Sequence, residues 1–291
     1  MRASHLGLAL SLVFIWGFTF VMIEAALRDL SPLFLCFIRF FLTSIPAVFF
    51  IKFPSTSFKL VALYGIFLFA LTMALLFMGM HSGVSSGLAS TLMQSQVFFT
   101  ILLAVVFLGE KLRRWQAIGA IVAFSGIALI GMKGGGSVTF SGFLLVIAAA
   151  LCWAIGNVIS KKIGKVNTIS LVIWGSLIAW PPLLVMSVIL EGSDRILFSL
   201  QNLSWITVGA VVYITYLATL VGFWIWSWLL NLYPLPMIAP FTLLVPIIAM
   251  TSSVFITGET LPSWKIGAGL LVIAGLCIDL LSSRLGCNKR S

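Results

Sequence analysis

Charged side chains are scarce in this chain. Only 8% of its 291 residues are Asp, Glu, Lys or Arg, whereas about 25% is usual in soluble domains. Hydrophobic residues make up 61%, and the mean hydropathy is +1.20. A soluble protein of this length could not bury so many apolar side chains, so we expect most of the chain to lie in lipid.

Several chemical signatures are missing as well. The sequence holds no Walker or HExxH motif, so ATP-driven transport and zinc-dependent hydrolysis lack their residues. The four cysteines show no CxxC or zinc-ligand spacing, and we expect no disulfide framework, metal or cofactor. No carboxylate lies at the centre of an apolar run. Coupling, if there is any, would have to use Glu24 or Asp279, near helix ends, or the charge of the substrate itself; transport without coupling is the remaining alternative.

What the chain does contain is a series of apolar runs long enough to cross a bilayer. A backbone in lipid must satisfy its own hydrogen bonds, and at this spacing only helices do so. We therefore expect an all-α integral membrane protein with ten transmembrane helices, at roughly 7–27, 32–51, 60–80, 84–108, 115–132, 141–160, 168–190, 205–230, 237–256 and 265–283.

The basic residues lie mainly on one side of these spans. With the N-terminus in the cytoplasm, the inside segments carry twelve Lys and Arg and the outside segments four. This positive-inside bias predicts that both termini are cytoplasmic. The net charge of +10 is thus a topology signal, and no basic stripe indicates nucleic-acid binding.

A sequence repeat divides the chain into two halves. GEKLRRWQAIGAIVAFSG at 109–126 returns as GETLPSWKIGAGLLVIAG at 258–275, an offset of 149 residues. Five spans per half is an odd number, so the second half enters the membrane upside down, and such inverted repeats are typical of secondary transporters. The expected domains are a first five-helix repeat at 1–132, a glycine-rich linker at 133–140, a second five-helix repeat at 141–283 and a basic cytoplasmic tail at 284–291.

Each copy of the repeat opens with a glycine and a glutamate. We expect the turn at Gly109 and Glu110 to lie inside and the turn at Gly258 and Glu259 outside. An acid at the start of a helix can accept backbone hydrogen bonds, so these four residues are predicted to fix tight turns.

Polar groups inside a span are costly and mark candidate binding residues. Arg39 is the only charge well inside a span. It could attract a carboxylate in a cavity, or it could cap carbonyls and snorkel toward the interface. In the fourth span Gly83, Gly87, Ser90 and Gln94 follow one helix face. The glycines favour helix packing, whereas Gln94, near the midplane, favours a cavity.

Trp16 and Trp153 lie near the middle of spans one and six, away from the interfaces that tryptophan prefers. They could form walls of a central cavity, to which Asn157 adds a donor and an acceptor, or they could fill space as a core pair. Tyr213 and Tyr216 lie near the middle of span eight.

Span eight ends in three tryptophans, and span nine contains a proline that bears on a candidate site. Trp224, Trp226 and Trp228 are most simply an interfacial belt. Pro246 lacks the N–H that would bond to the carbonyl of Thr242, and such a carbonyl is tolerated where it faces protein or a wet cavity.

Together these residues resemble the drug/metabolite transporter superfamily, and its EamA family in particular, over almost the whole chain. The blocks most similar to that family's bacterial exporters of cysteine and O-acetylserine are GLASTLMQSQVFFTI, CWAIGNVISKKI, SLVIWGSLI, YLATLVGFWIW and IAPFTLLVPII. The resemblance implies a basket-like bundle in which helices one, three, four, six, eight and nine surround a central cavity, with a lining that includes Trp16, Gln94, Trp153, Asn157 and Tyr216.

The resemblance also implies export of small amino-acid metabolites across the bacterial inner membrane. A neutral, aromatic and amide-lined cavity suits a small zwitterion better than a sugar phosphate. Other metabolites, nucleotide-like compounds and drugs stay open as cargo, and so does a non-transporting scaffold. A monomer suffices geometrically, and the oligomeric state is open. The predicted substrate-binding residues are Trp16, Arg39, Ser90, Gln94, Trp153, Asn157, Tyr213, Tyr216 and Thr242.

Overall fold

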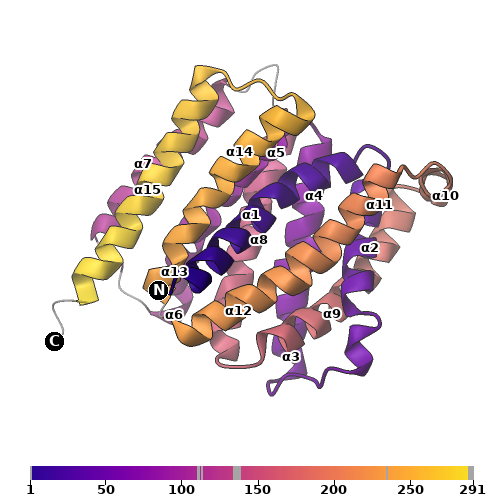
Figure 1. Ribbon diagram of the computed structural model, residues 1–291, viewed down its shortest axis with the longest axis horizontal. Coiled ribbons are helices and arrows are strands. Elements are labelled where there is room, and N and C mark those ends of the chain that lie inside the picture. Colours follow the sequence, from indigo (N-terminus) through magenta and orange to yellow (C-terminus); the bar gives the residue numbers. More distant parts are fainter. Residues whose placement is uncertain (1, 110–111, 113, 134–138, 234, 288–291) are drawn as a thin grey trace.

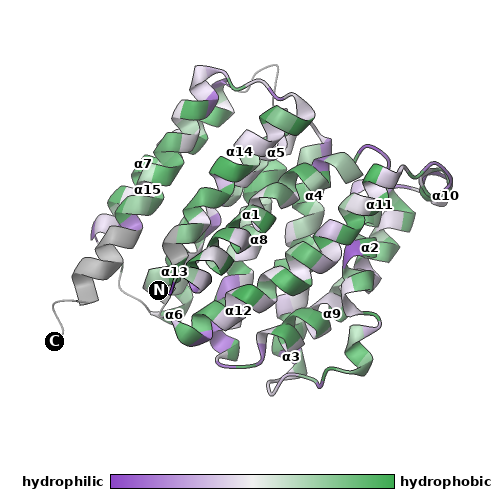
Figure 2. Ribbon diagram, viewed as in Figure 1, coloured by the Kyte–Doolittle hydropathy of each residue, from purple (hydrophilic) through white to green (hydrophobic). Residues whose placement is uncertain are grey.

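The protein is a bundle of helices, as the sequence predicts. The computed structural model describes residues 2–109, 112, 114–133, 139–233 and 235–287, with side chains described in these ranges except 235–236, 239–240 and 280–287. Within these ranges every regular element is a helix and no strand occurs (Figure 1). Apolar residues cover the helices, and polar residues gather mainly in the connections (Figure 2).

In the first half the helices follow the expected spans closely, with short additions and breaks. Their bounds are α1 Ala3–Ala26, α2 Pro32–Ser44, η1 Ala47–Phe49, α3 Phe58–Tyr64, η2 Gly65–Leu71, α4 Thr72–His81, α5 Ser86–Met93, α6 Gln96–Leu108 and α7 Arg114–Lys133.

The second half has the same order of long helices and one extra short helix, α10, between its second and third spans. The bounds are α8 Phe140–Ile163, α9 Thr168–Leu190, α10 Ser193–Gln201, α11 Trp205–Val212, η3 Tyr213–Val221, α12 Gly222–Leu232, α13 Leu235–Ile238, η4 Ala239–Leu243, α14 Leu244–Thr257 and α15 Ser263–Cys287.

Eight helical segments of the described chain are long and apolar enough to cross a membrane, and Phe241–Thr257 is a shorter apolar helix. Their outer surface is apolar too: Trp205 is 89% exposed and Phe255 is 87% exposed. Exposed aromatic side chains of this size indicate a lipid environment. The chain is therefore a multi-pass membrane protein, while the count of ten spans and the inverted arrangement stay predictions.

Several of the expected spans break or change helix type along their length. The second span breaks after Ser44 because Ile45 precedes Pro46 and is extended, at φ −102° and ψ 125°. The third and eighth spans contain π-helical segments, Gly65–Leu71 and Tyr213–Val221. The repeat offset of 149 places the first segment onto residues 214–220, inside the second. Thus both halves depart from α-helix at the same place.

Helices of one half pack on helices of the other. In the contacts α2 lies against α9 and α7 against α15, and Figure 1 shows α7 and α15 side by side at the left edge. Gly119 of α7 and Gly275 of α15 allow their backbones to touch, since a Cβ on Gly275 would lie 2.4 Å from the Gly119 carbonyl oxygen. Small residues at such a crossing are the usual means by which membrane helices approach closely.

Of the expected turns, one falls partly outside the described residues. Gly109 and Gly258 both end a helix in the left-handed conformation, at φ 68° and 70°, which glycine adopts without strain. Glu110 lies outside the described residues, as do 134–138 of the expected linker and 288–291 of the expected tail.

Candidate functional site

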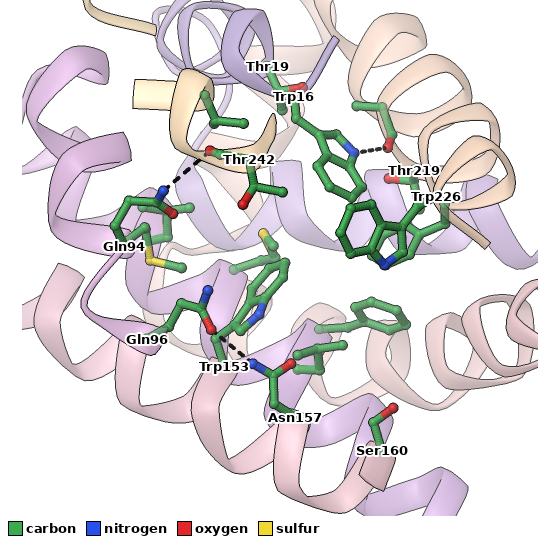
Figure 3. A pocket seen from close by; sticks show the side chains of 18 of the residues that line it. Trp16, Thr19, Gln94, Gln96, Trp153, Asn157, Ser160, Thr219, Trp226 and Thr242 are labelled. Atoms are coloured by element: carbon green, nitrogen blue, oxygen red, sulfur yellow. Dashed lines mark hydrogen bonds between the residues drawn. The ribbon is translucent and has the colours of Figure 1, made fainter. Parts of the chain in front are cut away.

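A cavity of about 640 Å³ lies within the bundle and is bounded by both halves of the chain (Figure 3). It is lined by residues of α1, α2, η2 and α4, α5 and α6, α8, η3 and α12, and η4 and α14, with one residue each from α3, α9 and α15. Six of the predicted site residues line it, namely Trp16, Arg39, Gln94, Trp153, Asn157 and Thr242.

Three other predicted residues do not line this cavity. Ser90 is buried and donates to the carbonyl oxygen of Gly87, one turn back in α5 (2.8 Å). Tyr213 donates to the carbonyl oxygen of Ile15 (3.0 Å), which ties η3 to α1. Tyr216 is 39% exposed on the outside of the bundle. The π-helical turn of η3 is wider than an α-turn, and it presents Ala218 and Thr219 to the cavity instead.

Gln94 lies where the fourth span is interrupted. Between α5 and α6 the amides of Gln94 and Ser95 bond three residues back, to Thr91 and Leu92 (3.2 and 3.1 Å), as in a 3₁₀ turn. The Gln94 side chain donates through Nε2 to the carbonyl oxygen of Thr242 (3.4 Å). This is the carbonyl that Pro246 cannot bond, so it faces the protein as the sequence predicts.

Gln96 and Thr100, which are not among the predicted site residues, follow the same turn and also line the cavity. Asn157 of α8 donates through Nδ2 to Gln96 Oε1 on α6 (2.9 Å; Figure 3). It also donates to Thr100 Oγ1 on the same helix (3.1 Å). A helical wheel drawn from Gly87 assumes 3.6 residues per turn, and the tighter turn at Gln94 shifts the face that follows. The signal available in sequence was the amide pair itself, Gln94 and Gln96, in one apolar run.

The aromatic wall is larger than expected. Trp16 donates through Nε1 to the carbonyl oxygen of Ala218 (3.1 Å). The centre of its ring lies 5.6 Å from the ring centre of Trp226 and 5.9 Å from that of Phe223. Trp226 therefore lines the cavity, which corrects its assignment to an interfacial belt. Successive helix residues point about 100° apart, so Trp226 can face inward while Trp224, 50% exposed, faces outward.

Arg39 supplies a buried positive charge to this lining. The residue is 6% exposed, and its Nε and Nη2 donate to Thr219 Oγ1 at 3.2 and 3.0 Å. Nη1 contacts Met73 Sδ at 3.5 Å, and the guanidinium lies 5.6 Å from the ring centre of Phe40. Thr219 in turn donates to the carbonyl oxygen of Ile214 (2.8 Å) within the π-helical segment, so its position is fixed.

A second polar cluster closes the end of the bundle where α14 stops and α15 begins. Glu259 receives Lys265 Nζ on Oε1 (2.8 Å), the Ser85 hydroxyl on the same oxygen and the Ser253 hydroxyl on Oε2. Ser86 extends the cluster by donating its hydroxyl to Ser253 Oγ (3.0 Å). The expected turn glutamate thus also joins the two halves.

The surroundings of Glu259 keep it ionised. Burial by itself would raise the pKa of this carboxyl, but hydrogen bonds from Lys265, Ser253 and Ser85, together with the charge of Lys265, outweigh burial and leave the pKa below its ordinary value. The cluster is therefore an ion pair supported by two hydroxyl donors.

The described residues contain no group of three or more His, Cys, Asp or Glu that could hold a metal ion. The donors that face the cavity are amides, hydroxyls, indoles and one guanidinium. Such groups bind and orient an organic solute by hydrogen bonds, ring contacts and charge.

Known proteins share sequence with most of this chain. The sequence matches the EamA-like transporter family over residues 4–132 and 140–280. It is 36% identical over 289 residues to a probable amino-acid metabolite efflux pump of Salmonella typhimurium strain LT2, covering 97% of each chain. It is also 36% identical over 283 residues to a protein of the same description from Escherichia coli strain K12, covering 95% of each.

More distant proteins are similar over nearly the whole chain. An uncharacterized transporter of Archaeoglobus fulgidus is 25% identical over 279 residues, covering 93% of this chain and 96% of its own. A crystal structure with 16% sequence identity superposes with a TM-score of 0.66 and covers 98% of each chain. The chain belongs to the EamA-like transporter family and is a multi-pass membrane transporter.

Proposed function

We propose that the protein is a secondary transporter that exports small amino acids or their metabolites, of the cysteine and O-acetylserine kind, across the bacterial inner membrane. The observation that carries this proposal is the central cavity of about 640 Å³, because both halves of the chain build it. A site between two halves can be opened to either side when one half moves against the other. The two relatives described as amino-acid metabolite efflux pumps support the substrate class.

The alternating-access mechanism rests on two inverted five-helix halves. The matched segments 4–132 and 140–280, the paired π-helical segments and the paired left-handed glycines all support that division. So does the α7–α15 contact, because Gly119 meets Gly275 while Gly126 meets Ala268. At the repeat offset of 149, Ala268 is the counterpart of Gly119 and Gly275 that of Gly126. A reciprocal pairing of this kind is what a two-fold axis between repeats produces.

The cavity extends to one end of the bundle. Its lining reaches Ser160, near the end of α8, Thr168, at the start of α9, and Leu230, near the end of α12. By the distribution of Lys and Arg this end is cytoplasmic, and the Glu259 cluster closes the opposite end. The proposed state is therefore one that takes up substrate from the cytoplasm.

The test of the function is counterflow in proteoliposomes. The purified full chain is placed in vesicles loaded with unlabelled amino acids, cysteine and O-acetylserine, and uptake of each labelled compound is followed with and without a pH gradient. We expect at least one of these compounds to exchange. Folded protein that exchanges none of them would contradict the proposal and favour a different cargo or a scaffold.

Asn157→Leu is expected to slow this exchange about tenfold, because it leaves the acceptors on Gln96 and Thr100 without their donor and removes a polar group from the cavity. Asn202→Leu is the matched control, since Asn202 is exposed and bonds only within its own helix end, to Phe198. Equal exchange rates in the two variants would argue against a substrate-binding role for Asn157.

If the two halves have opposite orientations, residues at equivalent positions of the repeat lie on opposite sides of the membrane. A reagent added to one side should then reach only one of the two. Arg114 and Ser263 are both exposed and are related by the repeat offset. In a chain whose four native cysteines are replaced, we expect a membrane-impermeant maleimide to label Ser263→Cys in intact cells. Arg114→Cys should be labelled only after the membrane is opened. Labelling of both from the same side would rule out the inverted arrangement.

A further inference from the structure

We infer that the cavity selects its cargo by a carboxylate that binds Arg39, and that the α-amino group of the cargo is not required. This inference rests on the proposed function and narrows it: the substrate class becomes small monocarboxylates, with amino acids and N-acylated amino acids as equal members. The reasons lie in the partners of Arg39 and in the remaining lining.

Arg39 has more donor capacity than the protein uses. A guanidinium carries five N–H donors. Two of them, on Nε and Nη2, point at the single hydroxyl oxygen of Thr219, and one on Nη1 meets the weak acceptor Met73 Sδ. No acidic side chain among the described residues lies within ion-pair distance of it. Two N–H groups of a residue that is 6% exposed, on the wall of a cavity, are thus left for a ligand.

A buried cation without a counter-charge is stabilised when an anion binds next to it. Placing a lone charge in a low-dielectric site is unfavourable, and an opposite charge at contact distance offsets that cost. The planar fork of arginine matches the two oxygens of a carboxylate better than it matches any neutral acceptor. Thr219 acts as a positioning residue, because its hydroxyl is held by Ile214 and in turn holds the guanidinium.

An ammonium group finds no equivalent partner in the lining. Asp279 is the one acidic residue among the lining residues described, and it already takes part in an interaction within the protein. The rest of the polar lining is neutral: Gln94, Gln96 and Asn157 offer amide groups, and the aromatic wall offers ring faces. These groups accept an amine or an acylated amine alike, so they do not make the amine a requirement.

The test compares three competitors that differ only at their charged ends. In the counterflow assay with labelled O-acetylserine we add serine, N-acetylserine or serinamide. N-acetylserine keeps the carboxylate without the ammonium, and serinamide keeps the ammonium without the carboxylate. We expect N-acetylserine to compete as well as serine, and serinamide to compete about tenfold to a hundredfold more weakly. Competition by serinamide equal to that of serine would overturn the inference.

Variants of Arg39 test whether this residue causes the difference in competition between N-acetylserine and serinamide. Arg39→Gln should abolish the difference between N-acetylserine and serinamide, whereas Arg39→Lys should keep a smaller one, because lysine retains the charge without the fork. Arg28→Gln is the control, since Arg28 is exposed in the loop after α1. Thr219→Val should weaken competition by N-acetylserine, and Thr219→Ser, which keeps the hydroxyl, should restore it. Unchanged discrimination in Arg39→Gln would contradict the assignment.

A binding measurement separates the failure of this inference from failure of the proposed function. Thermal unfolding of the purified chain in detergent is followed with N-acetylserine or serinamide, and the same scan shows that each variant is folded. We expect N-acetylserine to raise the midpoint in the wild type and to have no effect in Arg39→Gln. If nothing exchanges in vesicles but this shift is present, the transport proposal fails and the carboxylate site stands. If exchange occurs and the shift is absent, the carboxylate site fails.

Discussion

Replacing Glu259 by alanine is expected to lower the free energy of unfolding by about 3–5 kcal/mol. The side chains of Lys265 and Glu259 are 5% and 7% exposed and lie 2.8 Å apart, so the substitution leaves a buried ammonium without its counter-charge. It also leaves the hydroxyls of Ser85 and Ser253 without their acceptor. The measurement is unfolding of the purified protein in mixed micelles.

The double variant Glu259→Ala with Lys265→Met separates two causes of the loss. One is the missing attraction between Glu259 and Lys265, and the other is the buried charge that Lys265 keeps in the single variant. Removal of both charges should recover much of the stability, because a buried ion pair itself contributes little beyond the cost of burying its charges. A double variant no more stable than Glu259→Ala would show that the loss comes from the serine hydrogen bonds or from packing.

The same carboxylate predicts how stability depends on pH. The pKa of Glu259 in the folded protein lies below its ordinary value of 4.5. A group with a lowered folded pKa stabilises the fold above the unfolded pKa, and its contribution is lost as the pH falls through the folded pKa. We expect the wild type to lose stability below about pH 4.5 more steeply than Glu259→Gln, which has no proton to bind there.

Gly275→Ala is expected to destabilise the protein by about 1–3 kcal/mol, the usual cost of overpacking a closed contact. A Cβ at this position would lie 2.4 Å from the carbonyl oxygen of Gly119 and 2.7 Å from the backbone N of Ala123. Both are backbone atoms, so only a shift of α7 against α15 can make room. The thermal midpoint of the purified variant should therefore fall.

Gly267→Ala is the matched control on the same helix. A Cβ there meets nothing within 4 Å, and alanine favours a helix over glycine. The midpoint should stay unchanged or rise slightly. A similar fall in both variants would mean that glycine is needed along α15 for some reason other than the contact with α7.

Much of the fold could be predicted from the sequence because its causes are local. A span needs about 20 apolar residues in a row, so α1, α8 and α9 could be placed from composition alone. The glycines at 109 and 258 end their helices at the same left-handed turn for an equally local reason. The Thr242 carbonyl could be foreseen as well, since a proline four residues later always leaves it without its helical donor.

The residues that form the cavity wall could not all be predicted from the sequence. Some of them reach the wall through local changes of helix type, which a regular pattern of 3.6 residues per turn does not include. The tight turn at Gln94 carried Gln96 and Thr100 to the wall, and the π-helical segment turned Tyr216 outward and Thr219 inward. In both places a small change in residues per turn rotated every side chain that follows it.

The sequence by itself determined that this is a helical membrane protein with a repeated segment and with few, costly polar groups in its spans, because hydropathy and periodicity act within single segments. Only the tertiary structure decided which of those polar groups meet. Arg39 and Thr219 are 180 residues apart, and Ser85 and Glu259 are 174 apart. The packing of one half against the other determines which residues become partners, and local sequence patterns do not predict that packing.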